Sequence, residues 1–403
     1  MKSLFPPLSA ETRLLLNRLG FLADKVFPIP GRFRPALPKD IAELSRLLTS
    51  ARGERGASYL GKPALLSAYL RYFMPWNIYR LCRLLSGLTL DLKPGDAVND
   101  LGAGPLTLAC SLWISQPDLR SQPLEFRCID KTPSVLEAGR KIFTALTSAA
   151  LSSAPETAKT CPWTIKTIKG EIKKNGSLSV EIRGKPAALT AALNVYNELF
   201  WDFSPADSEG LEKFSEKQAR LLSSLTDKAG HILVVEPGIP RSGEFISVLR
   251  TSLLNNDRYP LSPCTHSYLC PFPGGQDKNK NKWCHFSFDT EDAPENLHRL
   301  SAAAGIPKER AVLSFLLSGV SPDISAGKKS KSEIRIISDP FPLGGGNPNE
   351  EGSWGRYGCS EQGLVLISGS RRKIEAAASG ALEALKLTPG KIDSKSGALI
   401  VNV

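Results

Sequence analysis

The sequence predicts an α/β protein with a doubly wound parallel sheet, preceded by a helical N-terminal domain and followed by a small C-terminal β region. Three observations support this fold class. Apolar residues recur at helical spacing across residues 1–90, short apolar segments then alternate with helical segments, and strand-like segments follow. Because strands that alternate with helices are joined by parallel crossovers, the middle of the chain is expected to form one parallel sheet.

We expect three domains. The helical N-terminal domain covers residues 1–90, and Pro75 is expected to break or kink its third helical segment. The α/β domain covers residues 91–341 and contains a cysteine-rich insertion at about residues 259–290. Residues 342–403 are expected to form a small β/α extension that carries one further cysteine.

The expected strands are short apolar runs bounded by turn residues or helical segments. The first strand follows a turn at residues 93–96 and leads into a glycine loop. Further strands are expected at residues 124–130, 163–169, 187–195, 231–238, 363–369 and 398–403. Residues 311–341 are expected to form a hairpin. Helices are expected at residues 133–151, 215–227, 242–254 and 371–385.

The glycine loop follows the first strand and opens a helix. Gly102 and Gly104 let the backbone approach a ligand closely, and the helix N-terminus favours polar or anionic groups. Asp100 precedes the loop, and Asp130 ends the next strand, where an acid can bind ribose hydroxyls. Leu106 stands where a third glycine is expected. These residues predict a cofactor site, and the alternative is a structural glycine turn without a cofactor.

Two residues after the strand at 187–195 are candidate catalytic residues. Asn197 and Glu198 lie where this kind of sheet places substrate-side groups. Glu198 could act as a base, hold substrate or cap the following helix, and Glu236 at another strand end has the same ambiguity. An Asn-Pro-Pro-Tyr sequence, typical of amino-group methylation, is absent.

Four of the 8 cysteines are candidate metal ligands. Cys264, Cys270 and Cys284 crowd into one polar loop, and Cys359 lies far downstream beside glycines. Their spacing is too wide for a compact zinc knuckle, although neighbouring histidines leave a zinc site open. Four thiolates with varied spacing favour an iron–sulfur cluster. The alternatives are zinc and no metal.

The chain is basic, with 51 Lys and Arg against 40 Asp and Glu. Much of this excess lies in four runs, which predict a polyanionic partner, most simply RNA. The alternative is a solvated surface. The runs comprise Lys166, Lys169, Lys173, Lys174, Arg183 and Lys185; Lys278, Lys280 and Lys282; Lys328, Lys329 and Lys331; and Arg371, Arg372 and Lys373.

No long apolar segment predicts a membrane span or a signal peptide. The expected compartment is therefore a reducing cytoplasm, where clustered cysteines bind metal more often than they form disulfides. We expect a monomer without a membrane partner.

The glycine loop and its acids resemble the class I S-adenosylmethionine-dependent methyltransferase fold. That resemblance implies that Gly102 and Gly104 line the methionine moiety and that Asp130 binds the ribose.

A more specific resemblance covers Tyr69 to Leu366. It is carried by C-x-H-x₃-C-P at Cys264, then W-C-H-F, after V-E-P-G and the helix ISVLR. These motifs resemble the methyltransferase-like family of small-ribosomal-subunit proteins, whose mitochondrial members are regarded as assembly factors. The family implies S-adenosylmethionine binding, association with small-subunit rRNA, and a [4Fe–4S] cluster on the four cysteines named above.

The resemblance predicts an S-adenosylmethionine-binding, iron–sulfur protein that acts on the small ribosomal subunit. The lack of an organellar leader favours a bacterial, cytoplasmic member over a mitochondrial one. Two alternatives stay open. One is a non-catalytic rRNA-binding assembly factor that keeps the fold, and the other is a zinc-stapled methyltransferase with a protein or small-molecule substrate.

Overall fold

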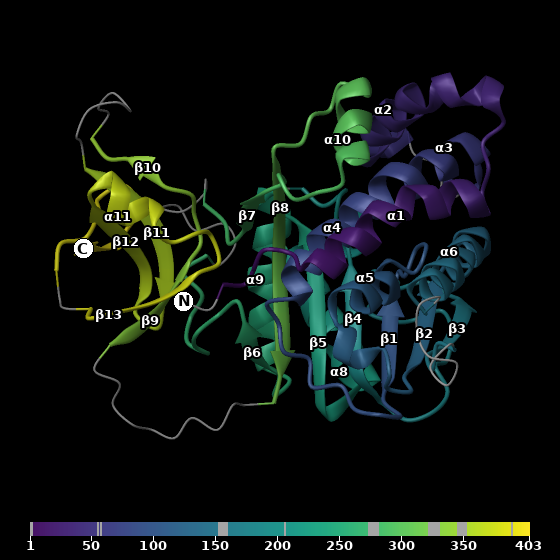
Figure 1. Ribbon diagram of the computed structural model, residues 1–403. Helices are drawn as coiled ribbons and strands as arrows, with labels where there is room; N and C mark the ends of the chain where they lie inside the picture. The colour runs from purple at the N-terminus through teal and green to yellow at the C-terminus, as the bar shows by residue number, and fades with distance from the viewer. Residues whose placement is uncertain are drawn as a thin grey trace.

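The protein is built on two β-sheets, with helices covering the larger one (Figure 1). In Figure 1 the smaller, C-terminal sheet lies to the left and the larger sheet to the right. The computed structural model describes residues 3–54, 56, 59–151, 160–204, 207–272, 282–320, 331–344, 353–387 and 390–403.

The larger sheet is doubly wound, as the sequence predicts. Its strand order is β3-β2-β1-β4-β5-β8-β6, and β7 also pairs with β8. Strands β1 to β5 run parallel, whereas β8 runs antiparallel to β5, β6 and β7. The bounds are β1 (Ala97–Leu101), β2 (Glu125–Asp130), β3 (Thr164–Lys169), β4 (Ala187–Leu193), β5 (Thr226–Pro237), β6 (Tyr259–Ser262), β7 (Phe286–Asp289) and β8 (Arg310–Gly319).

Helices cover both faces of this sheet because each face is apolar. One hydrophobic cluster joins the N-terminal helices, α5 and α6 to one face, and a second joins α7, α8 and α9 to the other. The bounds are α1 (Ala10–Val26), α2 (Leu37–Leu48), α3 (Pro63–Ala68), α4 (Met74–Leu85), α5 (Thr107–Ser115), α6 (Pro133–Leu151), α7 (Tyr196–Leu199), α8 (Ser208–Leu225), α9 (Pro240–Leu254), α10 (Glu295–Ala303) and α11 (Arg371–Glu375).

The N-terminal helices share their core with the larger sheet. Helix α1 begins at the cap Ser9, whose hydroxyl accepts a hydrogen bond from the Thr12 amide at 3.1 Å, and its leucines face that core. Pro75 does not break the helical segment. Helix α3, a π-helix at Tyr69–Phe73 and α4 follow one another without a gap, so the irregularity before Pro75 is a widened helical turn and not a break.

The smaller sheet has the order β13-β9-β11-β12-β14, with β10 paired to β11. The expected strands at residues 363–369 and 398–403 are confirmed as β12 and β14. The bounds are β9 (Ser332–Ile336), β10 (Phe341–Pro342), β11 (Trp354–Ser360), β12 (Gly363–Gly369), β13 (Leu382–Leu385) and β14 (Leu399–Asn402).

Two expectations for the C-terminal third are wrong. The apolar segments within residues 311–341 do not form a hairpin, because β8 pairs within the larger sheet and β9 within the smaller one. The helix expected at residues 371–385 ends at Glu375, and its second half forms β13, which pairs with β9. Gly380, at φ +84°, interrupts the helical pattern between them.

Candidate functional site

The glycine loop connects β1 to α5 at the carboxyl edge of the parallel strands. Gly102 has φ +70°, and a Cβ there would lie 2.4 Å from Val195 Cγ2. Gly104 has φ +52° but faces open space, because a Cβ there would have no neighbouring atom within 4 Å. Leu106, at the missing third glycine, adopts a left-handed conformation at φ 58°. The loop therefore needs glycine at 102 for packing and leaves space beside 104 for a ligand.

Asp130 fixes the shape of this loop. One of its carboxylate oxygens accepts the Gly104 amide at 3.0 Å, and the other accepts the Thr132 amide at 2.8 Å. Burial raises the pKa of the Asp130 carboxyl, and these two hydrogen bonds oppose that rise. Each oxygen keeps a further lone pair, so Asp130 can still accept a hydrogen bond from a ligand hydroxyl.

Asp100 is a buried acid at the base of the same pocket. It is 1% exposed, and neither carboxylate oxygen has a hydrogen-bond partner among the described residues. Burial raises the pKa of Asp100 to about 8, with a further contribution from the charge of Asp130. A buried acid without a partner is costly unless a ligand contributes to its stabilisation, so Asp100 is well suited to a cationic or hydrogen-bond-donating group.

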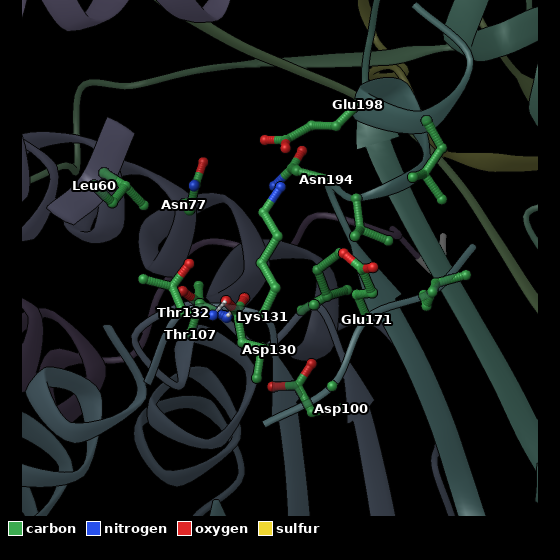
Figure 2. Close-up of a pocket in the computed structure, with 18 of the residues that line it drawn as sticks. Leu60, Asn77, Asp100, Thr107, Asp130, Lys131, Thr132, Glu171, Asn194 and Glu198 are labelled. Carbon is green, nitrogen blue, oxygen red and sulfur yellow. Dashed lines mark hydrogen bonds between the residues drawn. The ribbon is translucent and has the colours of Figure 1, made fainter. Parts of the chain in front are cut away.

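The pocket has a second wall that the sequence did not predict. Tyr69 and Asn77 line it from the N-terminal helical region. Figure 2 shows Asn77 on the side opposite Glu171. Burial raises the pKa of the Tyr69 phenol, and the charges of Glu198 and Asp130 raise it further. The only sequence signal is the aromatic segment before Pro75, which by itself indicates no more than a helix. Other lining residues missed from the sequence are Lys131, Thr132, Glu171 and Asn194.

The two candidate catalytic residues differ in position. Glu198 lines the pocket and points toward Asn194 and Asn77 in Figure 2. Asn197 is buried beside the pocket, and its backbone carbonyl accepts a hydrogen bond from Arg52 at 2.8 Å. Only Glu198 of this pair is therefore placed to meet a ligand in the pocket.

The structure shows a structural role for Glu236, whose role the sequence alone left ambiguous. It is buried, and its two oxygens accept the amides of Tyr196 at 2.8 Å and Asn197 at 3.1 Å. Burial raises the pKa of Glu236 to about 8. The side chain therefore anchors the start of α7, which carries Glu198 into the pocket.

The four candidate metal-binding cysteines converge between the two sheets. Cys264 and Cys270 follow β6, Cys284 precedes β7, and Cys359 lies on β11 of the smaller sheet. Burial raises the pKa of Cys284, and the charges of the other three thiols raise it further. The pKa of Cys359 is raised in the same way by burial and then by Cys264 and Cys270. Thiols distant by up to 95 positions in the chain are thus electrostatic neighbours.

Polar contacts surround the cysteine group. Arg250 on α9 donates a hydrogen bond to Cys264 Sγ at 3.3 Å, and its guanidinium also binds the carbonyls of His266 and Tyr268. His266 Nε2 lies 3.7 Å from Cys359 Sγ, and Arg335 on β9 donates to the Pro263 carbonyl at 3.0 Å. These contacts join the cysteine loop to the smaller sheet.

Within the described residues, no group of three or more His, Cys, Asp or Glu side chains is spaced to hold a single metal ion. The thiols around an iron–sulfur cluster stand further apart than the donors around one ion, because the cluster lies between them. The donor set therefore fits a compact zinc site poorly and leaves the cluster as a hypothesis.

Part of the predicted RNA-binding charge is paired within the protein. Lys166 forms an ion pair with Glu125 at 2.6 Å, and Lys174 forms one with Asp202 at 2.7 Å. Lys169 is exposed on the edge strand β3 and has no ion pair among the described residues. Within the first run, Lys169 is therefore more available to an RNA phosphate than the ion-paired Lys166 and Lys174.

The other basic runs are only partly described. Lys278 and Lys280 of the second run, and Lys328 and Lys329 of the third, lie outside the described residues. Lys282 Nζ lies 4.7 Å from the Tyr357 ring centroid, and Arg371 pairs with Glu375 at 2.7 Å. The part of the chain that the structure describes has no helix long and apolar enough to cross a membrane.

Comparison with known proteins supports the family resemblance. Residues 165–343 match the model of the family described as mitochondrial small ribosomal subunit Rsm22. None of the curated proteins compared with the chain matches it. The predicted family resemblance is therefore confirmed over this segment, which includes β3 to β9 and three of the four cysteines.

Several similar solved structures are described as methyltransferases, although the likeness is distant. Geranyl diphosphate C-methyltransferase from Streptomyces coelicolor A3(2) is 8% identical with a TM-score of 0.30, covering 57% of this chain and 74% of that chain. A TehB-like S-adenosylmethionine-dependent methyltransferase from Corynebacterium glutamicum is 10% identical, with a TM-score of 0.27. The match covers 72% of this chain and 100% of that chain. The class I methyltransferase-like fold rests on the strand order and on the loop after β1.

Proposed function

We propose that this chain, related over residues 165–343 to the Rsm22 family, binds S-adenosylmethionine and acts on the small ribosomal subunit. The observation that carries the proposal is the pocket at the carboxyl edge of the larger sheet. The glycine loop lines this pocket, and so does Asp100, whose carboxyl oxygens have no hydrogen-bond partner among the described residues. A ligand with hydroxyls and a positive charge satisfies both features.

The residues present fit this cofactor. Asp130 keeps acceptor capacity for ribose hydroxyls while it holds Gly104 and Thr132 in place. Asp100 offers a carboxylate to a cationic ligand group, which would offset the cost of burying its charge. When bound, S-adenosylmethionine supplies an electrophilic methyl group. The protein's part is to bind, to orient and to exclude water from that group.

Glu198 is the residue that we assign to the acceptor side of the pocket. Its carboxylate lies at the pocket wall, on a helix that Glu236 anchors. There it can accept a proton from the group that attacks the methyl, or hold the acceptor by a hydrogen bond. If the protein transfers no methyl group at all, it is a scaffold that has kept the cofactor pocket, and the experiment below separates these two functions.

We also propose that Cys264, Cys270, Cys284 and Cys359 bind a [4Fe–4S] cluster. Support comes from the shared electrostatic environment of the four thiols, of which Cys270 is buried and the other three are half-buried. Bound there, the cluster would supply the charge balance that buried thiolates need. It would also tie the loop after β6 to strand β11. Zinc, the alternative that the sequence leaves open, fits these residues less well, because no three described donors are spaced for one ion.

The partner that we propose is small-subunit rRNA. The family match and the net charge of +11 support it. The family description is mitochondrial, and the expectation of a bacterial cytoplasmic protein stays a prediction.

The test is transfer of labelled methyl groups from S-adenosylmethionine to isolated small ribosomal subunits. We expect transfer by the wild type and by the exposed-acid control Asp118→Asn, and loss of transfer in Asp130→Asn and Glu198→Gln. If the wild type binds the cofactor and the subunit but transfers no methyl group, the protein is a non-catalytic assembly factor and not an enzyme.

A further inference from the structure

A second cavity lies beside the cofactor pocket, between α4 and β8. Its volume is about 310 Å³, within the size range of small-ligand sites. Asn77 lines this cavity and also lines the cofactor pocket, so the two spaces adjoin at one side chain. The function proposed above uses only the first of them.

The cavity holds two cations that lack carboxylate partners in the part of the chain that the structure describes. Arg80 and Lys308 both line it, and neither forms an ion pair with any described residue. Arg80 instead donates hydrogen bonds to the neutral oxygens of Val312, at 3.1 Å, and Asn77. A third cation, Arg310, lines the cavity but pairs with Asp339 at 2.7 Å.

The two unpaired cations repel each other. Burial lowers the pKa of Lys308 to about 8, and the nearby charge of Arg80 lowers it further. Burial also lowers the pKa of Arg80. Holding two like charges together in a half-buried site is unfavourable in the free protein, so an anionic ligand would relieve a cost that is already present.

The start of α9 opens on the same space. Pro237, Gly238 and Ile239, which precede the helix, line the cavity. This helix has 15 residues, and its N-terminal end favours a negative charge. The helix end adds to an arrangement that the two side-chain cations already define.

We propose that this cavity binds a phosphate group of the RNA strand whose nucleotide enters the adjoining cofactor pocket. The inference rests on the proposed function for the choice of RNA. Phosphate is the group that Arg and Lys cations bind throughout nucleic-acid interfaces, and it lies at every nucleotide of an acceptor strand. A phosphate held beside Asn77 would fix the register of that strand relative to the cofactor.

The test is the affinity of the full chain for a labelled single-stranded RNA across a series of salt concentrations. Lys308→Gln removes one cavity cation. Lys228→Gln is the matched control, because Lys228 is exposed at the opposite end of β5 from the cavity. Lys308→Arg keeps the positive charge, so it shows whether substitution at this position by itself disturbs folding.

We expect Lys308→Gln to weaken RNA binding about tenfold and to lower the salt slope by about 0.7, as for one lost phosphate contact. Lys308→Arg and Lys228→Gln should stay within about threefold of the wild type. Equal affinities for Lys308→Gln and Lys228→Gln would overturn the inference.

A parallel titration with a nucleoside monophosphate and with inorganic phosphate separates the sources of the phosphate. If Lys308→Gln abolishes binding of these small anions but leaves RNA affinity intact, the site takes a free phosphate and the RNA inference is wrong. Cofactor binding is measured on the same preparations. A wild type that fails to bind S-adenosylmethionine contradicts the proposed function, whereas cofactor binding with Lys308-independent RNA affinity contradicts only this inference.

Discussion

The cofactor pocket draws its floor from neighbouring strands of one sheet, whereas the four cysteines come from a loop of the larger sheet and a strand of the smaller one. In the pocket, the Asp130 carboxylate accepts hydrogen bonds from the backbone amides of Gly104 and Thr132, which fixes the loop without any ligand. In the cysteine group, burial and the charges of neighbouring thiols raise the pKa of Cys284 and Cys359. The comparison indicates that the pocket is preformed, whereas ionised thiols in the cysteine group would need a bound cofactor to stabilise them.

The largest effect is expected at the cysteine group. Cys284→Ser should remove most of the iron and sulfide from anaerobically purified protein and destabilise the fold by several kcal/mol, because binding of the proposed cluster would contribute to folding. Iron and acid-labile sulfide analysis measures the loss, with about four of each expected per wild-type chain. The control is Cys161→Ser, a half-buried cysteine outside the group.

One equivalent of zinc without sulfide in the wild type would contradict the cluster. Unchanged iron content in Cys284→Ser would also contradict the proposed ligand set.

A second prediction separates packing from ligand space within the pocket. Gly102→Ala should lower the free energy of unfolding by about 2–4 kcal/mol, because its Cβ would meet Val195 at positive φ. Gly104→Ala should cost only about 1–2 kcal/mol, since its Cβ meets open space, yet weaken cofactor binding. Urea unfolding and cofactor titration measure the two effects. Equal stability losses for the pair would show that the loop packs differently.

A third prediction concerns the pH dependence of stability. In the folded protein the pKa of Asp100 is about 8, whereas in the unfolded chain it is near 3.8. Between these values the folded state keeps a proton that the unfolded state has lost. Stability should therefore fall as the pH rises from about 4 to about 8 and then level off.

Asp100→Asn should make that fall shallower by a few kcal/mol, whereas Asp118→Asn should not. Urea unfolding at about pH 5 and about pH 8 measures the difference. Glu236, whose pKa is also raised to about 8, contributes in the same direction and accounts for a residual slope. An unchanged fall in Asp100→Asn would mean that Asp100 is ionised in the folded protein.

The smallest effect is expected on the surface. Lys169→Gln should weaken small-subunit binding about two- to threefold, because an exposed, unpaired cation can reach a phosphate. Lys166→Gln should have less effect, since Lys166 already pairs with Glu125. Filter binding at two salt concentrations distinguishes them. A larger loss in Lys166→Gln would place the RNA elsewhere on this edge.

Much of the pocket could be predicted because its determinants are local. A strand, two glycines and a strand-end acid occupy one stretch of about 30 residues, so Asp100, Gly102, Gly104 and Asp130 could be read from their order. Tyr69 and Asn77 could not, because only the packing of the N-terminal helices on the sheet brings them to the opposite wall.

The C-terminal third was harder to predict for a similar reason. The strands β8 and β9 follow each other and look like a hairpin, but each finds more apolar surface in a different sheet. The sequence after Arg371 has a helix-like pattern, but its second half forms strand β13 because it pairs with β9. Tertiary pairing overrides local propensity in such short segments.

The measurement that tests the central claim most directly is calorimetric titration of the anaerobically purified protein with S-adenosylmethionine. The account predicts binding by the wild type and by Asp118→Asn, and at least a tenfold weaker affinity for Asp130→Asn, which loses one carboxylate oxygen at the loop. Equal affinity for all three proteins, or no binding by the wild type, would contradict it.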